Sequence, residues 1–143
     1  MAKKQRPGQR PFNPEALHRY ATAELYPRIG SGAPVYRYTV IVPAEEIRPM
    51  KRLKASPDDL EALRDLLTRD FGGLTMSPAS PGYGLRDPAR PDVVPEMNYN
   101  FAFVVYAAPV YEADNYFLAL RRELEAALAE GVILVEKQQV FLI

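Results

Sequence analysis

Acidic residues are the side chains of this sequence whose type and spacing come closest to a catalytic pattern. Paired carboxylates are typical of general acid–base sites. Three such pairs occur in the chain: Asp58 and Asp59, Glu112 and Asp114, and Glu123 and Glu125. The first two pairs lie where we expect helices to begin, and the helix dipole favours acids there. The members of the third pair are too close in a helix to face the same way. Each pair therefore has a structural explanation.

Glu96 and His18 are the remaining candidates for chemistry. Glu96 follows Pro95 at the end of a long segment, where a carboxylate could bind a ligand, act as a base, or be a solvated residue at a strand end. His18 is the single histidine, which excludes a two-histidine metal site, and we expect it at the surface or in a partner contact. The absence of cysteine excludes thiolate metal sites, disulfides and cysteine nucleophiles. The sequence predicts no metal site, no catalytic residue and no cofactor.

Basic and acidic residues are unevenly distributed along the chain. Residues 1–54 contain eleven Lys and Arg against four acids, and residues 55–143 contain seven against fourteen, so the net charge is zero. A basic half can neutralise phosphates, or it can lie against the acidic half or an acidic partner. The residues that we expect to bind nucleic-acid phosphates are Lys3, Lys4, Arg6, Arg10, Arg48, Lys51, Arg52 and Lys54.

The proline-rich segment from residue 77 to residue 95 is predicted to be a long loop. Loops of this length inside a domain are uncommon and often functional. Gly82 and Gly84 favour a turn, and no P-loop lysine follows them. Tyrosine and arginine are frequent in contact hot spots. We therefore expect partner contacts from Tyr83, Arg86 and Arg90.

Length and composition indicate one domain. The chain has 143 residues, and its apolar fraction of 48% is enough for a core without disulfides or metals. Residues 1–12 are basic and rich in Gly, Gln and Pro, so we expect a flexible arm there and a single α+β domain over residues 13–143. No apolar stretch follows the basic N-terminus, and no apolar run is long enough to cross a bilayer. We expect a cytoplasmic protein without a membrane partner.

Three helices are predicted from capping residues and helical periodicity. The first begins after Asn13 and ends near Pro27, the second begins after Ser56 and ends at Gly72, and the third runs from about residue 114 to residue 130. The apolar stripes expected to be buried on the second and third helices are Leu60, Leu63, Leu67 and Phe71, and Phe117, Leu120, Leu124 and Leu128.

Strands are expected at residues 35–42, from residue 74, at residues 98–107, and over residues 132–143 as one bent strand or two short ones. The resulting β-α-β-β-α-β order places both helices on one face of a four-stranded antiparallel sheet. We predict an α+β fold of the ferredoxin-like kind, with an extra N-terminal helix. On the third strand we expect Ala102, Val104 and Tyr106 to face the helices, which leaves Phe101 and Phe103 on the open face.

Four short motifs lie in the C-terminal half: a Phe-Gly-Gly-x-Thr helix stop, a Gly-x-Gly loop, an acid before the third strand and a closing Val-x-x-Val-Glu strand. Their residues are Phe71, Gly72, Gly73, Thr75, Gly82, Gly84, Glu96, Val132, Val135 and Glu136. In these motifs the chain resembles a class of uncharacterised bacterial ferredoxin-like domains. The resemblance implies the fold and brings no activity with it.

The third predicted strand carries the run Phe-Ala-Phe-Val-Val-Tyr from residue 101 to residue 106. This run resembles the last six positions of the third-strand motif of RNA-recognition-motif domains, which share the same order of strands and helices. Tyr99 and Asn100 stand where that motif has a basic residue and a glycine. The resemblance implies that Phe101 and Phe103 stack on bases.

Two functional hypotheses follow. The first is a non-enzymatic binding module for nucleic acid or a nucleoprotein assembly, in which the basic residues hold phosphates and Phe101 and Phe103 contact bases. The alternative is an oligomeric or regulatory protein-interaction domain that pairs through the open sheet face or the last strand. An enzyme acting through Glu96 and nearby tyrosines is a third. Exposure of the two phenylalanines would favour the first hypothesis, and a helix lying over them would favour the second.

Overall fold

The described chain combines helices with strands. The computed structural model describes residues 9–30, 32–44, 55–84, 89, 96–128 and 133–143. Its elements in chain order are the 3₁₀ helices η1 (Pro14–Tyr20) and η2 (Ala23–Leu25), then β1 (Pro34–Ala44), α1 (Pro57–Phe71), β2 (Thr75–Gly84), β3 (Glu96–Ala107), α2 (Tyr111–Leu128) and β4 (Leu134–Phe141). The predicted α+β class is confirmed.

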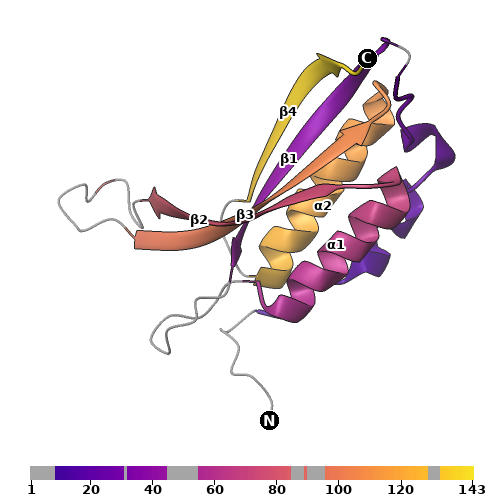
Figure 1. Ribbon diagram of the computed structural model, residues 1–143. Helices are drawn as coiled ribbons and strands as arrows, with labels where there is room; N and C mark the ends of the chain where they lie inside the picture. Colours follow the sequence, from indigo (N-terminus) through magenta and orange to yellow (C-terminus); the bar gives the residue numbers. More distant parts are fainter. Residues whose placement is uncertain (1–8, 31, 45–54, 85–88, 90–95, 129–132) are drawn as a thin grey trace.

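The strands form one antiparallel sheet in the order β2-β3-β1-β4. Figure 1 shows α1 and α2 side by side over one face of this sheet. No helix in the described part of the chain covers the opposite face, which we call the open face. The domain therefore has two layers, and its main hydrophobic cluster lies between them.

Local signals place the ends of α1. The Ser56 hydroxyl accepts a hydrogen bond from the Asp59 backbone N–H, and the Asp59 carboxylate accepts one from the Ser56 N–H, both at 3.2 Å. The helix ends at Gly72, whose φ of 84° lies in the left-handed region. The ring of Tyr26 lies 3.1 Å from the position that a Cβ would occupy at Gly72. A side chain there would be both strained and crowded.

The apolar stripes predicted for the two long helices face the sheet. All their members are buried except Leu60, which is partly buried against the core. The Tyr38 ring of β1 stacks on the Phe117 ring of α2 with a centroid distance of 4.0 Å. Helix α2 begins at Tyr111, slightly earlier than predicted. The helical periodicity of the sequence therefore identified the buried sides correctly.

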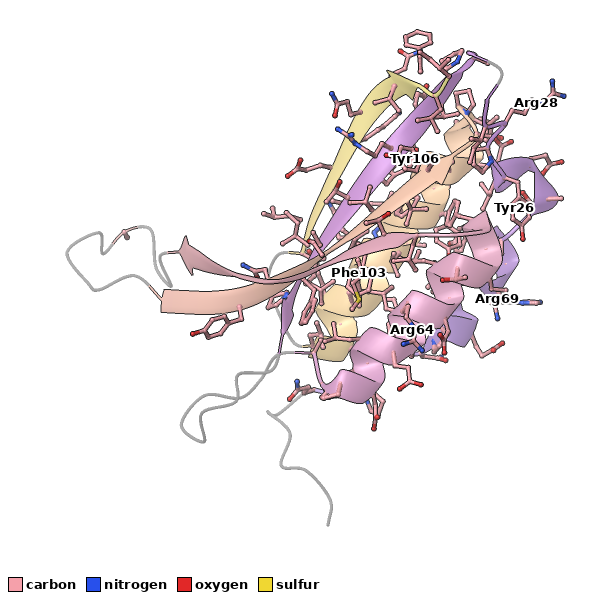
Figure 2. The ribbon with its side chains drawn as sticks, in the orientation of Figure 1. Tyr26, Arg28, Arg64, Arg69, Phe103 and Tyr106 are labelled. Carbon is pink, nitrogen blue, oxygen red and sulfur yellow. The ribbon has the colours of Figure 1, made fainter. Side chains whose placement is uncertain are left out.

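The side chains of β3 have the opposite orientation from the one predicted. Phe103 is fully buried and lies between sheet and helices (Figure 2). Phe101 is partly buried against the same core. In the register, Phe103 pairs with Val40 of β1, which is buried on the helix side. Paired residues of antiparallel strands share a face. The prediction that Phe101 and Phe103 lie on the open face is therefore wrong, and Ala102, Val104 and Tyr106 occupy that face.

Much of the segment predicted to be a loop belongs to the sheet. Strand β2 continues to Gly84, which pairs with Glu96 at the start of β3. A register shift between Ser77 and Ser80 accommodates part of the proline-rich sequence, since proline cannot donate to the ladder. The expected turn at residues 82–84 is strand. Residues 85–88 and 90–95 of the predicted loop lie outside the described chain.

Residues 9–12 are attached to the helices. The Arg10 N–H donates to the carbonyl of Ala127 at 2.8 Å, and the Phe12 N–H donates to the Asp59 carboxylate at 3.0 Å. The Phe12 side chain is 5% exposed and belongs to the core. The end of the predicted arm, residues 9–12, is thus part of the folded domain. Residues 1–8 lie outside the described chain.

The N-terminal helix predicted after Asn13 consists of the two short 3₁₀ helices η1 and η2. The Asn13 side chain caps η1 by accepting a hydrogen bond from the Glu15 N–H at 3.2 Å. Leu17 and Leu25 are fully buried. These turns therefore contribute directly to the core.

The C-terminal segment forms a single strand, β4, which pairs with β1 from Leu134 to Phe141. This pairing decides between the two arrangements that the sequence left open. Strand β4 lies at one edge of the sheet, and β2 lies at the other.

Candidate functional site

The open face of the sheet is the candidate functional surface. Register assigns side chains to it, because residues opposite one another in antiparallel strands share a face. Its described residues are Val35, Arg37, Thr39, Ile41, Pro43, Thr75, Ser77, Asn100, Ala102, Val104, Tyr106, Leu134, Glu136, Gln138 and Val140, of which Val35 is buried. All four strands contribute.

Apolar side chains form a band across this face. Ile41 of β1 is flanked by Ala102 of β3 and Leu134 of β4, and Val104 and Tyr106 continue along β3. Leu134 is 55% exposed, and the other four are partly exposed. Apolar surface that stays accessible on a folded domain is typical of contact sites. We call these five residues the apolar band.

Arg37 and Glu136 are the two charged side chains on the described part of the open face. The solvent-facing sides of the helices are far more charged. Their exposed ionisable residues include Asp58, Glu61, Arg64, Asp65, Arg69, Asp114 and Arg122. Depletion of charge at the centre of a surface is a compositional property of protein interfaces.

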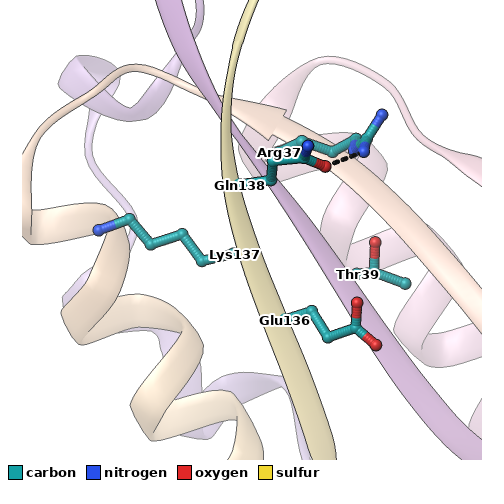
Figure 3. A pocket seen from close by; sticks show the side chains of 5 residues that line it. All are labelled: Arg37, Thr39, Glu136, Lys137 and Gln138. Carbon is teal, nitrogen blue, oxygen red and sulfur yellow. Dashed lines mark hydrogen bonds between the residues drawn. The ribbon is translucent and has the colours of Figure 1, made fainter.

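A shallow hollow of about 250 Å³ lies between β1 and β4 on this face. It is lined by Arg37, Thr39, Glu136, Lys137 and Gln138. The Arg37 guanidinium donates a hydrogen bond to the Gln138 side-chain oxygen. Figure 3 shows Lys137 on the other side of β4 from this pair, directed toward α2. The hollow therefore offers one cationic and one anionic group to whatever covers the face.

A polar network ties the helix side of β1 and β4 to α2. The Tyr38 hydroxyl donates to Asp114 Oδ1 at 2.6 Å, and Lys137 Nζ donates to Asp114 Oδ2 at 3.0 Å while lying 4.0 Å from the Tyr36 ring centroid. Burial, followed by the bond to Asp114, raises the pKa of Tyr38 well above its usual range. Burial alone would raise the pKa of Asp114, but its hydrogen bonds to Tyr38 and Lys137 lower it. The three groups satisfy one another, which gives the network a structural role.

A second network joins α1 to α2. The buried carboxylate of Asp70 accepts hydrogen bonds from the Tyr116 hydroxyl at 2.7 Å and from Arg69 Nε at 2.9 Å. Burial, followed by the bond to Asp70, raises the pKa of Tyr116 far above its usual range. The Tyr26 hydroxyl also donates to the backbone carbonyl of Arg69 in α1, at 2.7 Å (Figure 2). These contacts hold the two helices and the N-terminal turns together.

Four of the six residues in the acidic pairs bind parts of the protein itself, and Asp114 is one of them through Tyr38 and Lys137. Asp59 caps α1, and Glu123 forms an ion pair with Arg10. Glu125 accepts a hydrogen bond from the Ile133 N–H at 3.0 Å. His18 is exposed on η1, as expected.

Three of the ten residues predicted to bind nucleic acid lie in the described chain. The side chain of Arg10 is held by Glu123, and Phe103 is inaccessible to a base because helices cover it. Phe101 lies on the same covered side. The other seven, Lys3, Lys4, Arg6, Arg48, Lys51, Arg52 and Lys54, lie outside the described residues. Base stacking by the two phenylalanines is thus lost, while phosphate binding stays a prediction.

The predicted partner-contact residues are described only in part. The backbone of Tyr83 pairs with Met97, so this residue lies in a strand, while Arg86 and Arg90 lie outside the described residues. The backbone of Glu96 pairs with Gly84. The hypotheses about the side chains of these residues stay predictions.

Metal binding and membrane insertion are two further properties on which the described residues bear. No group of three or more histidine or acidic side chains there is arranged to hold a metal ion. No helix in the same part of the chain is long and apolar enough to cross a membrane.

Sequence reasoning missed the apolar band and the position of Glu136 on the same face. Alternation in β1 separates Arg37, Thr39 and Ile41 from the residues between them, and the structure places these three on the open face. Strand β3 is apolar on both faces, so alternation alone left its orientation open. The pairing of Val104 with Thr39 would have shown which side of β3 faces the helices, but this pairing is known only from the register of the folded sheet.

No protein-family model, no curated protein and no solved structure matches this chain. The motif resemblances around Phe71 and Phe101 therefore stay predictions. The function is inferred from the geometry and chemistry of the open face.

Proposed function

We propose that this protein is a non-enzymatic protein-interaction module that associates through the open face of its sheet. The observation that carries this proposal is a partly exposed apolar band on a face with two charged residues and no helix over it, within the described chain. Burial of Phe103 beneath the helices removes the base-contacting surface of the nucleic-acid hypothesis and favours the alternative. The module is an oligomeric or regulatory scaffold rather than a reader of bases.

The proposed architecture is a ferredoxin-like sandwich. The element order β1-α1-β2-β3-α2-β4 and the strand order β2-β3-β1-β4 support it. A sheet with helices on one side leaves its second face to solvent or to another molecule. Association through that face completes a third layer.

Phosphate binding by the basic segments is a second candidate function, favoured by the excess of seven basic residues in residues 1–54. The basic segments are residues 1–8 and 45–54, and the described residues that adjoin them lie at one end of the domain (Figure 1). The Phe12 N–H binds Asp59 in the first turn of α1, and the Ala55 N–H donates to the Pro43 carbonyl at 2.9 Å.

A charge placed in the apolar band tests the main proposal. Val104→Arg puts a guanidinium at the centre of the open face, where it can reach solvent in the isolated domain, and should abolish association. The matched control is Leu118→Arg, which places the same group at an exposed position of α2. Cross-linking mass spectrometry of the full chain in cell extract should show intermolecular links near the open face that Val104→Arg removes and Leu118→Arg retains. Identical links in wild type and Val104→Arg would eliminate the proposal.

A further inference from the structure

We infer that the partner of the open face is the open face of a second copy of this chain, in a dimer with two-fold symmetry. This inference rests on the proposed function, because it names the occupant of the same surface. Its physical basis is that the surface is complementary to itself in charge and in apolar character.

The two charges of the open face have the arrangement that a two-fold axis requires. Arg37 lies opposite Gln138 in the ladder, and Glu136 lies opposite Thr39 one step further along the same face. In an isologous interface, if residue i of one copy contacts residue j of the other, then j also contacts i. A two-fold axis can pass between Arg37 and Glu136 in the plane of the interface. It then brings Arg37 of each copy against Glu136 of the other copy. Two equivalent ion pairs then form, and no charge on the described part of the face is left uncompensated.

Both charged groups are available for such a contact. Within the described residues the Glu136 carboxylate makes no hydrogen bond or ion pair. The Arg37 guanidinium donates through Nη2 to Gln138, which leaves further N–H groups for a carboxylate. Figure 3 shows both side chains on the same side of the sheet. A face that repels a copy of itself would instead carry charges of one sign.

The apolar band supplies the remainder of the contact. Ile41, Val104 and Tyr106 lie beside the charged pair on the neighbouring positions of β1 and β3. Tyrosine is favoured at such positions because it combines apolar area with a hydroxyl that tolerates partial solvation. The same two-fold axis packs the band of one copy onto the band of the other, with each ion pair at its border.

The size of the face predicts how tightly the copies associate. With strands about 4.8 Å apart and about 3.4 Å per residue, four strands present a plane of roughly 20 by 25 Å. This planar area of roughly 500 Å² is below the roughly 800 Å² of accessible surface that each partner buries in a standard stable interface. The dimer should therefore be concentration-dependent, and its population should be measured over a range of concentrations.

Charge reversal on the full-length protein gives a test that misfolding cannot imitate. Sedimentation equilibrium should show a monomer–dimer equilibrium in the wild type at concentrations up to about 1 mM. Arg37→Glu and Glu136→Arg should each weaken self-association by roughly tenfold or more, because like charges then face each other twice. An equimolar mixture of the two variants should form a heterodimer, since every charge again meets its opposite, and the double variant Arg37→Glu/Glu136→Arg should dimerise like the wild type. The matched controls Arg122→Glu and Glu61→Arg make the same charge changes on exposed helix surfaces and should leave dimerisation unaltered.

The outcomes separate this inference from the proposed function. A wild type that is monomeric at every concentration, or a pair of variants that fails to form a heterodimer, overturns the inference. If Val104→Arg in those circumstances still abolishes binding of a different protein, the proposed function stands with another partner. If Val104→Arg has no effect on any association, both are wrong.

Discussion

The guanidinium of Arg10 and the carboxylate of Glu123 form a two-pronged ion pair, with Nη1–Oε2 at 2.6 Å and Nη2–Oε1 at 2.7 Å. Glu123 is 8% exposed and also accepts the Asn13 N–H at 3.0 Å. The hydrogen bond to Glu123 raises the pKa of Arg10. A residue expected to hold a nucleic-acid phosphate thus holds the N-terminal segment against α2.

Replacing Arg10 by alanine should destabilise the domain. The variant leaves the buried Glu123 carboxylate without its charged partner, which carries a penalty beyond the lost contact. Because the guanidinium is itself 45% exposed, we expect a modest loss of about 1–2 kcal/mol. Urea denaturation measures it, with Arg122→Ala on the exposed side of α2 as the control. Equal stabilities of the two variants would mean that the ion pair does not anchor the segment.

Phe103 and Tyr106 should differ sharply in their effect on stability, because they lie on opposite faces of β3. Phe103→Ala opens a cavity in the core and should cost about 3–5 kcal/mol. Tyr106→Ala removes a partly exposed side chain from the open face and should cost clearly less. Thermal and chemical unfolding of the two variants, measured on dilute monomer, test this order. A reversed order would return the phenylalanines to the open face.

Alkaline pH should destabilise the protein through Tyr116. Its pKa is raised in the folded state, so the neutral hydroxyl contributes stability that is complete below the unfolded pKa of about 10 and is lost as the pH rises above that value. Tyr116→Phe should therefore flatten the decline of unfolding free energy above about pH 10. The control is Tyr111→Phe at an exposed position. A decline equally steep in both variants would argue against the buried hydroxyl as its source.

Salt dependence tests phosphate binding by the basic segments. If Lys3, Lys4 and Arg6 contact phosphates, their joint replacement by glutamine should reduce the slope of log affinity against log salt by up to about three ion equivalents. Arg10→Gln should change that slope little, because Glu123 already engages the guanidinium. Fluorescence anisotropy with a labelled oligonucleotide over a salt series gives both slopes. Salt-independent binding in the wild type would rule out a phosphate contribution.

Signals between nearby residues were sufficient to predict the long helices. Ser56 and Asp59 form a capping box through groups three positions apart, and Gly72 ends α1 because its backbone conformation suits glycine. The buried stripes repeat at helical spacing, so they follow from geometry within one helix. These features hold whatever the helix packs against.

The candidate surface could not be predicted in the same way. Strand β3 is apolar on both faces, so alternation separates its side chains into two sets without showing which set is buried. Pairing of Phe103 with Val40 resolves the choice, and that pairing depends on the register between strands distant in sequence. The described part of the proline-rich segment as far as Gly84 likewise becomes strand, because β3 supplies pairing partners back to Glu96.

The sequence by itself determined the two long helices, their buried sides, the α+β class and the uneven distribution of charge. Tertiary structure alone decided that Arg10 meets Glu123, a residue 113 positions away, and that Arg37 and Glu136 share a face with the apolar band. The reason is physical. Helix capping and helical periodicity depend on hydrogen bonds and side chains within a few residues, whereas the composition of a sheet face depends on which strands pair and in which register.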